Sequence, residues 1–325
     1  MNLATIARPQ PFSIVRQDPD VLKQLLADKR SENTKRAYAG DVKDFFKTVA
    51  GQLPDKILVT EFLQLPERDA VALVLKWKSV MLSGEGRKKP LAESTINRRL
   101  AAIKSLVAMG QNLGVCNYNL ARVKGETVAR YRDTTGIDKD TFQQILATCN
   151  RETVAGKRDY ALLRLLWGNA LRRNEVSQLS LKDFNSTAGT LQILGKGQGT
   201  QYQSIDVGPA TVQAIKDWLA ARPGIATETD PIFVALDFAS IGHRLTGDGL
   251  YKLVQRRTKA AGIDKVMSPH RIRHSAITAA LDATDGNVRK VQKLSRHKNL
   301  NTLMIYDDNR GRDQQEITSL LDGMM

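Results

Sequence analysis

The stretch that decides the fold class of this chain is KLSRHKNLNTLMIYDDN, residues 293–309, which sets His297 nine residues before Tyr306. Just upstream, SPHRIRHSAIT (residues 268–278) adds two more histidines, so three of the four histidines in the 325-residue chain lie near its C-terminus. Histidine exchanges protons near neutral pH. A tyrosine taken alone is more often a core or surface residue than a nucleophile. The clustered histidines therefore indicate where the chemistry is located.

The next informative stretch upstream is WGNALRRNEVSQLSLKDF, residues 167–184. It places Arg172 and Arg173 in an otherwise apolar helical context, where a buried guanidinium must be paired or must bind an anion. Glu175 can supply the pairing charge, so for this stretch alone a structural ion pair and an anion site are equal alternatives. The register of the helix decides which of the two arginines faces inward.

The convincing β signal lies between these two regions. The segments TLQIL (190–194) and QYQSIDV (201–207) flank the turn GKGQG and predict an antiparallel hairpin that holds Lys196 in its turn. A phosphate-binding loop is excluded, because the glycine spacing is wrong and Gly197 stands where Ser or Thr is required. The turn also joins two strands, so no helix N-terminus would meet a phosphate there.

The N-terminal half is helical and basic. The stretches TKRAYAGDVKDFFKTVA (34–50) and STINRRLAAIKSLVAMG (94–110) each predict a helix with one apolar face, the first capped by Asn33. Either helix alone is more often a surface helix with a solvated basic face, but two in one small helical region predict a clamp for nucleic acid. The residues of this half expected to contact DNA are Thr34, Lys35, Arg36, Lys43, Lys88, Lys89, Thr95, Arg98, Arg99 and Lys104.

Shifts in composition predict the domain organisation. Residues 1–20 contain three prolines and predict an extended arm. Residues 124–136 (KGETVARYRDTTG) are polar and lack apolar periodicity, which is typical of a linker. We therefore expect a helical domain at residues 21–123 and a second domain at residues 137–325.

The composition favours a polyanionic partner. Lys and Arg total 49 against 34 Asp and Glu, and the net charge of +15 suits nucleic acid first and an anionic membrane surface second. No apolar run could span a membrane and the N-terminus has no hydrophobic signal core, so we expect a cytoplasmic protein. Two cysteines are too few for a disulfide framework. His270 and His274 lack the neighbouring glutamate of zinc proteases, so no metal site is expected.

The order of these pieces, an arginine, a hairpin lysine, His-x-x-Arg and His-x8-Tyr, resembles the tyrosine recombinase family. ALRRNEVSQLSLKDF (170–184) is similar to its Gly-Leu-Arg-Ile-Ser-Glu-Leu box and SPHRIRHS (268–275) to its Pro-His-x-Leu-Arg-His box. RHKNLNTLMIY (296–306) is similar to its Gly-His-x-x-x-x-x-Thr-x-x-Tyr box. SENTKRAYAGDVKDF (31–45) and ESTINRRLAAIKSL (93–106) resemble the core-binding domain of Xer-like and Cre-like members. The resemblance implies an all-α, SAM-like core-binding domain followed by an α+β catalytic domain.

The resemblance implies DNA strand transfer without a metal or nucleotide cofactor. Tyr306 would attack the scissile phosphate and form a 3′-phosphotyrosyl link, while Arg172 and Arg273 would hold the nonbridging oxygens. Lys196 would donate a proton to the departing 5′ oxygen. His270 and His297 would hydrogen-bond the phosphate, and His270 could also accept the tyrosine proton.

The resemblance also implies the partners. Two double-stranded DNA sites are expected to pair in a homo-tetramer and to exchange strands through a Holliday junction. Arg256 and Arg257, in LTGDGLYKLVQRRTKAAG (245–262), are expected to contact DNA, the alternative being a solvated basic face. The amphipathic segment around residues 317–321 would pack on a neighbouring subunit or in cis.

Two other functions fit parts of the pattern. A type IB topoisomerase shares the chemistry but would relax DNA that lacks a special site, and the core-binding resemblance argues against it. A non-catalytic DNA-binding or bridging protein would be expected to lack part of the catalytic set. The chain also departs from the family pattern: Arg173 stands where an apolar residue is usual, and Arg296 replaces the glycine before the second histidine.

Overall fold

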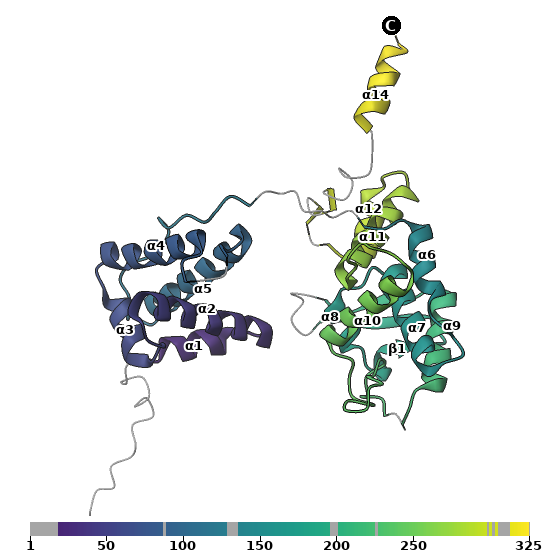
Figure 1. Ribbon diagram of the computed structural model, residues 1–325, viewed down its shortest axis with the longest axis horizontal. Coiled ribbons are helices and arrows are strands. Elements are labelled where there is room, and N and C mark those ends of the chain that lie inside the picture. Colours follow the sequence, from purple (N-terminus) through teal and green to yellow (C-terminus); the bar gives the residue numbers. More distant parts are fainter. Residues whose placement is uncertain are drawn as a thin grey trace, which may run out of the picture. The chain divides into compact units, whose positions relative to one another are not determined.

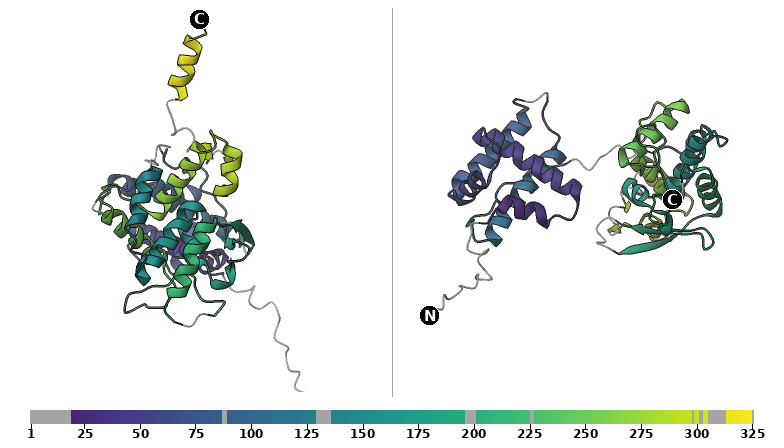
Figure 2. Two further views of the ribbon diagram at one scale, coloured as in Figure 1. Left: turned by 90° about the vertical axis from the view of Figure 1, so that its right-hand side faces the viewer. Right: turned by 90° about the horizontal axis from the view of Figure 1, so that it is seen from below.

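The computed structural model describes residues 19–86, 89–128, 136–195, 201–224, 227–297, 299–300, 303–304 and 313–324. The chain forms two compact units, Met1–Arg130 and Tyr131–Met325. Each unit is built mainly from helices (Figures 1 and 2), and the sheet is a small antiparallel one. The predicted fold class is therefore confirmed. Among the described residues, no helix is long and apolar enough to cross a membrane.

The described part of the N-terminal unit is all-helical, and aromatic rings fill its core. Phe45 packs edge-to-face on Phe62 and on Trp77, with ring centroids 5.0 and 5.2 Å apart. Such contacts add to the stabilisation that burial of the rings provides. The helices are α1 (Val21–Asp28), α2 (Glu32–Ala50), α3 (Lys56–Gln64), α4 (Glu67–Ser83) and α5 (Glu93–Asn112).

The two helices predicted in this unit form as α2 and α5. The predicted apolar face of α2 is buried, and Phe45 and Phe46 lie in it. The predicted cap was wrong, because α2 begins two residues earlier: the hydroxyl of Ser31 accepts the backbone N–H of Thr34, and Asn33 lies inside the helix. The helix ends at Gly51, whose φ of 71° favours glycine.

The C-terminal unit contains a three-stranded sheet with strand order β1-β2-β3, and alternate residues of β2, Leu191 and Ile193, are buried in the core. The predicted hairpin is confirmed, with Thr190 opposite Asp206 and Leu194 opposite Tyr202; residues 196–200 of its turn lie outside the described residues. The short strand β1 was not predicted. The elements are α6 (Lys139–Ala147), α7 (Val154–Gly168), α8 (Arg173–Gln178), β1 (Phe184–Asn185), β2 (Thr190–Leu194), β3 (Tyr202–Asp206), α9 (Pro209–Ala221), α10 (Gly247–Ala260), α11 (Pro269–Asp282), α12 (Val288–Ser295) and α14 (Asp313–Asp322).

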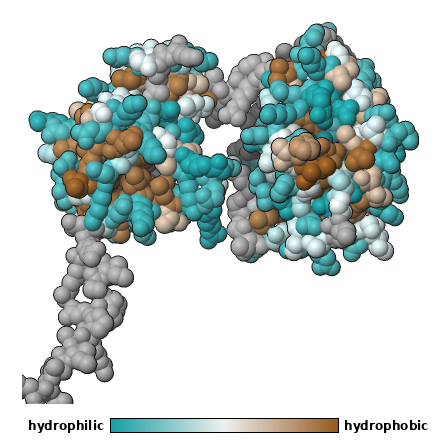
Figure 3. Space-filling view, turned by 60° about the horizontal axis from the view of Figure 1, so that its bottom comes forward, coloured by the Kyte–Doolittle hydropathy of each residue, from teal (hydrophilic) through white to brown (hydrophobic). Residues whose placement is uncertain are grey.

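Helix α7 is the central element of this unit and packs against α9, α11 and α6. Its run ALLRLLWG is apolar nearly all round, as expected for a helix enclosed by neighbours. Trp218 of α9 is fully buried beside it and donates its indole N–H to the carbonyl of Ile232. Hydrophobic residues also reach the surface of both units (Figure 3), which is usual for globular proteins.

Candidate active site

Helix α11 places the predicted His-x-x-Arg pair at the edge of the core. The hydroxyl of Ser268 caps the helix by accepting the N–H of Arg271, and Pro269 occupies its first turn. His270 is exposed, whereas Arg273, three residues on, is buried. The guanidinium of Arg273 donates to the backbone carbonyls of Ala170 and Ser295, and Nη2 lies 3.3 Å from Nε2 of His297. Arg273 thus joins the ends of α7 and α12.

The structure separates the roles of the two adjacent arginines. Arg172 is the N-cap of α8; its Nη1 donates to Oε1 of Glu175 at 2.7 Å, and its backbone N–H donates to Oε2 at 2.9 Å. Arg173 is half exposed and lies 3.5 Å from Oδ1 of Asp248. Of the two adjacent arginines, Arg172 is therefore the one that pairs with Glu175.

The buried carboxylate of Glu175 also pairs with a second arginine, Arg296. Arg296 follows α12, has a left-handed backbone with φ 55°, and places Nη2 3.2 Å from Oε2 of Glu175. Burial alone would raise the pKa of Glu175, but Arg296 and the bonds from Arg172 outweigh it and lower that pKa. Glu175 is therefore a carboxylate near neutral pH, held between two guanidiniums.

His297 is held neutral by its surroundings. Burial, followed by the positive charge of Arg273, Arg172 and Arg296, lowers its pKa to about 4. A guanidinium can only donate, so Nε2 of His297 is the acceptor in its contact with Arg273. His270 also contributes to the lowered pKa. The structure thus brings Arg172, Arg273, His270 and His297 into one electrostatic cluster.

Two imidazoles, those of His270 and His274, form a pair on α11. The Nε2 atoms of His270 and His274 are 2.8 Å apart, and the rings meet edge to face at 4.3 Å between centroids. At that distance one nitrogen must carry the proton that the other accepts. The two remaining predicted catalytic residues, Lys196 and Tyr306, lie outside the described residues.

The cluster carries an excess of positive charge. The carboxylate of Glu175 pairs with two guanidiniums, those of Arg172 and Arg296, while the guanidinium of Arg273 contacts the neutral imidazole of His297. Planar guanidiniums suit the paired oxygens of a phosphate. The arrangement can hold a phosphodiester and stabilise extra negative charge on it during attack. The sequence did not indicate that Arg296 takes part, although its replacement of a glycine was a visible signal.

The predicted DNA contacts of the N-terminal unit fall into two groups. Arg98 and Arg99 of α5 pair with Asp41 and Asp44 of α2, and the ammonium of Lys104 donates to the carbonyl of Val123. These three cations thus also hold the unit together. Lys88 lies outside the described residues. The other predicted contacts are exposed or half-buried: Thr34, Lys35, Arg36, Lys43, Lys89 and Thr95.

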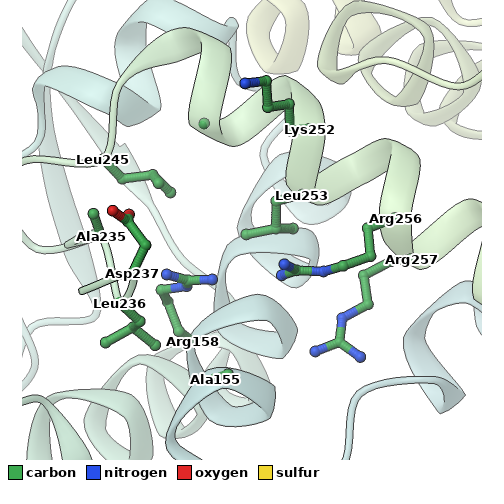
Figure 4. Close-up of a pocket in the computed structure, with 11 residues that line it drawn as sticks. Ala155, Arg158, Ala235, Leu236, Asp237, Leu245, Lys252, Leu253, Arg256 and Arg257 are labelled. Atoms are coloured by element: carbon green, nitrogen blue, oxygen red, sulfur yellow. The ribbon is translucent and has the colours of Figure 1, made fainter. Parts of the chain in front are cut away.

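The two predicted contacts on α10 differ in exposure. Both guanidiniums bond to the buried carboxylate of Asp159, yet the side chain of Arg256 is 61% exposed and that of Arg257 only 16%. Figure 4 shows both beside Arg158 at a pocket of about 430 Å³, with Lys252 one helical turn before Arg256. Arg256 therefore faces solvent, whereas Arg257 is turned inward.

The comparisons with known proteins agree with this geometry. A profile of the phage integrase family matches residues 136–312. The chain is 48% identical over 313 residues to a tyrosine recombinase of Synechocystis sp., covering 96% of this chain and 98% of that protein. It is 50% identical over 305 residues to a tyrosine recombinase of Synechococcus elongatus, covering 94% and 93% of the two chains.

Among solved structures, the fold is similar to that of the XerH site-specific recombinase bound to palindromic difH substrate in a post-cleavage complex. The TM-score is 0.67 at 20% identity, covering 93% of this chain and 84% of that chain. A lambda integrase dimer bound to a core site gives a TM-score of 0.63 at 13% identity, covering 90% and 76%. The chain therefore belongs to the phage integrase family of tyrosine recombinases.

Proposed function

We propose that this protein is a site-specific DNA recombinase that cleaves and rejoins DNA through a covalent 3′-phosphotyrosyl intermediate. The observation that carries the proposal is the contact of Arg273 with His297, with Arg172 and His270 close enough to help lower the pKa of that imidazole, from segments spread over 125 residues of sequence. The two relatives named as tyrosine recombinases support it and favour neither a topoisomerase nor a non-catalytic bridging protein.

The proposed reaction is a transfer of phosphodiester bonds between two hydroxyl groups. Tyr306 attacks the phosphorus while Arg172 and Arg273 hold the nonbridging oxygens, and the 5′ oxygen leaves with a proton from Lys196. His297 lies beside them as a neutral imidazole that accepts from Arg273, and His270 receives the tyrosine proton. A phenol with a pKa near ~10 is a weak nucleophile at neutral pH, so the surrounding guanidiniums are needed to favour its anion. The ester conserves the energy of the broken bond, so rejoining requires neither a nucleotide nor a metal.

We propose that both units bind the DNA duplex. In the N-terminal unit the exposed cations of α2, Arg36, Lys43 and Lys47, share one helix face and are suited to phosphate contacts. In the C-terminal unit the exposed residues of α10 include Lys252 and Arg256, one helical turn apart. Titration with DNA that contains the native flanking sequence tests the proposal, since Arg256→Ala should weaken binding.

Assembly on DNA is the finer part of the proposal. We propose that four copies pair two DNA sites, exchange strands through a Holliday junction, and act at the nucleoid in the cytoplasm. The exposed Leu320 and Leu321 of α14 support docking of that helix on a neighbouring subunit. Sedimentation of the protein alone and with DNA tests this part, because four copies should assemble on paired sites.

The experiment that tests the function traps the covalent intermediate. The protein is incubated with DNA containing its native flanking sequence, the reaction is stopped with detergent, and protease-sensitive adducts are sought. Wild type should give adducts and Tyr306→Phe none. Adducts formed equally on arbitrary DNA, with relaxation of supercoiled plasmid, would indicate a topoisomerase instead. Absence of adducts with wild type would contradict the proposal.

A further inference from the structure

We propose that Arg296 is a positioning residue for the proposed phosphate-binding arginine Arg172, acting through Glu175. This inference rests on the proposed strand-transfer function and extends it to a residue that does not contact the phosphate. It is carried by the contacts of Arg296, by its burial and by its backbone conformation.

The side chain of Arg296 is almost fully enclosed. It is 7% exposed, and its Nη1 donates to the carbonyls of Leu294 at 2.7 Å and of Asn169 at 3.2 Å. Its Nη2 reaches Oε2 of Glu175 at 3.2 Å and the carbonyl of Ala170 at 3.4 Å. A buried guanidinium must be bonded on most sides, and these contacts supply that. They also tie the end of α12 to the turn between α7 and α8.

Arg296 determines how Glu175 can hold Arg172. A free carboxylate commonly grips an arginine with both oxygens. Here Oε1 accepts Nη1 of Arg172, while Oε2 is engaged by the backbone N–H of Arg172 and by Arg296. Glu175 is thus held to a one-point grip on the Arg172 side chain. That grip fixes the direction of the guanidinium while leaving its second edge for a phosphate oxygen.

The backbone of Arg296 is strained where its side chain makes these contacts. Arg296 has φ 55° and Ala170, whose carbonyl it contacts, has φ 44°. Both lie in the left-handed region, where glycine carries no steric cost and other residues do. Two strained residues therefore meet at one contact, and Arg273 donates to the same carbonyl of Ala170. The structure keeps this strain because Arg296 links the segments that carry both phosphate-binding arginines.

If Arg296 only stabilised the fold as an ion pair, its replacement would affect DNA cleavage kinetics differently than if it positioned Arg172. The test uses full-length Arg296→Gly, which relieves the backbone strain while removing the guanidinium, and Arg296→Lys, which keeps a charge without the planar fork. Each is made alone and together with Arg172→Lys. Single-turnover cleavage of a native-site DNA is measured at saturating protein, and the dissociation constant of the DNA is measured separately.

We expect Arg296→Gly to slow cleavage about tenfold to a hundredfold, the scale of misplaced catalytic groups. DNA affinity should stay within about twofold, and Arg296→Lys should restore part of the rate. In the Arg172→Lys background, Arg296→Gly should cause almost no further loss, because both changes disable the same interaction.

The matched control is Arg158→Lys. Arg158 is 7% exposed, as Arg296 is, and pairs with the buried Asp159 away from Glu175. Its effect on the cleavage rate should add to that of Arg172→Lys. The inference is overturned if Arg296→Gly cleaves at the wild-type rate, if its loss adds fully to that of Arg172→Lys, or if the loss lies wholly in DNA affinity. If Arg296→Gly does not fold, Arg296→Lys decides by the same criteria. Absence of cleavage by wild type would instead refute the proposed function.

Discussion

Replacing Glu175 by glutamine removes the one carboxylate between two guanidiniums while keeping the size of the side chain. Glu175 is 3% exposed, and its oxygens accept from Nη1 and the backbone N–H of Arg172 and from Nη2 of Arg296. In Glu175→Gln the guanidiniums of Arg172 and Arg296 lose their counterion, and the new amide N–H₂ would face donors. We expect the C-terminal unit to be destabilised.

The loss of stability expected for Glu175→Gln depends on how deeply Glu175 and its two arginine partners are buried. Removing one partner of a buried ion pair costs about 3–5 kcal/mol, because the remaining charge is left without compensation. Arg296 is buried, but the side chain of Arg172 is 27% exposed, so water screens part of its charge. We therefore expect about 3 kcal/mol, the lower end of that range. That is a large share of the 5–15 kcal/mol typical of a domain.

The assay is urea unfolding monitored by hydrogen exchange of the backbone amides of α7 and α11, because these amides report on the C-terminal unit alone. Asp183→Asn is the control: Asp183 is buried, accepts the N–H of Ser180 at 2.8 Å, and its replacement can keep that bond. The control should lose about 1 kcal/mol or less. The folded pKa of Glu175 is lowered, so its contribution is present above pH 4.5 and is lost as the pH falls through the folded value. An effect of Glu175→Gln no larger than that of the control would refute the reasoning.

Three further outcomes are expected. The folded pKa of His297 is about 4 against 6.5 unfolded, so the native state binds fewer protons between these values and wild type loses stability as the pH falls through that window. With half of the shift discounted for solvent screening, His297→Gln should abolish about 1–2 kcal/mol of that loss, and an unchanged pH profile would contradict it. Arg257→Ala should lower the free energy of unfolding by about 1.5–3 kcal/mol because it removes a donor to buried Asp159, whereas Arg256→Ala should cost less than about 1 kcal/mol but weaken DNA binding; equal effects on stability would be inconsistent with their exposure. The logarithm of the DNA-binding constant, measured by fluorescence anisotropy, should fall linearly with the logarithm of salt concentration, and a flat response would exclude the basic clamp.

The sequence predicted the elements that local patterns determine. The apolar face of α2, the hairpin of β2 and β3 and the burial of the Arg172 region all follow from periodicity and turn residues within short windows. The ordered motifs pointed to the cluster around Arg273 and His297, although these residues lie 24 apart and meet through the packing of α11 and α12.

Contacts between distant segments could not be predicted in the same way. The pairing of Arg296 with Glu175 spans 121 residues, and that of Arg98 with Asp41 spans 57. A basic helix face looks the same in sequence whether its cations meet solvent or a carboxylate on another helix. For the same reason, only the folded structure shows that Arg257 is largely buried where it pairs with Asp159, whereas Arg256 stays exposed.

The central claim is that Tyr306 forms the covalent bond to DNA. The most direct measurement is mass spectrometry of the trapped adduct after nuclease and protease digestion, combined with end-labelling of the released strand. We expect a nucleotide attached through its 3′ phosphate to Tyr306, and a free 5′-hydroxyl on the other DNA end. A nucleotide on another residue, or a link through a 5′ phosphate, would contradict it.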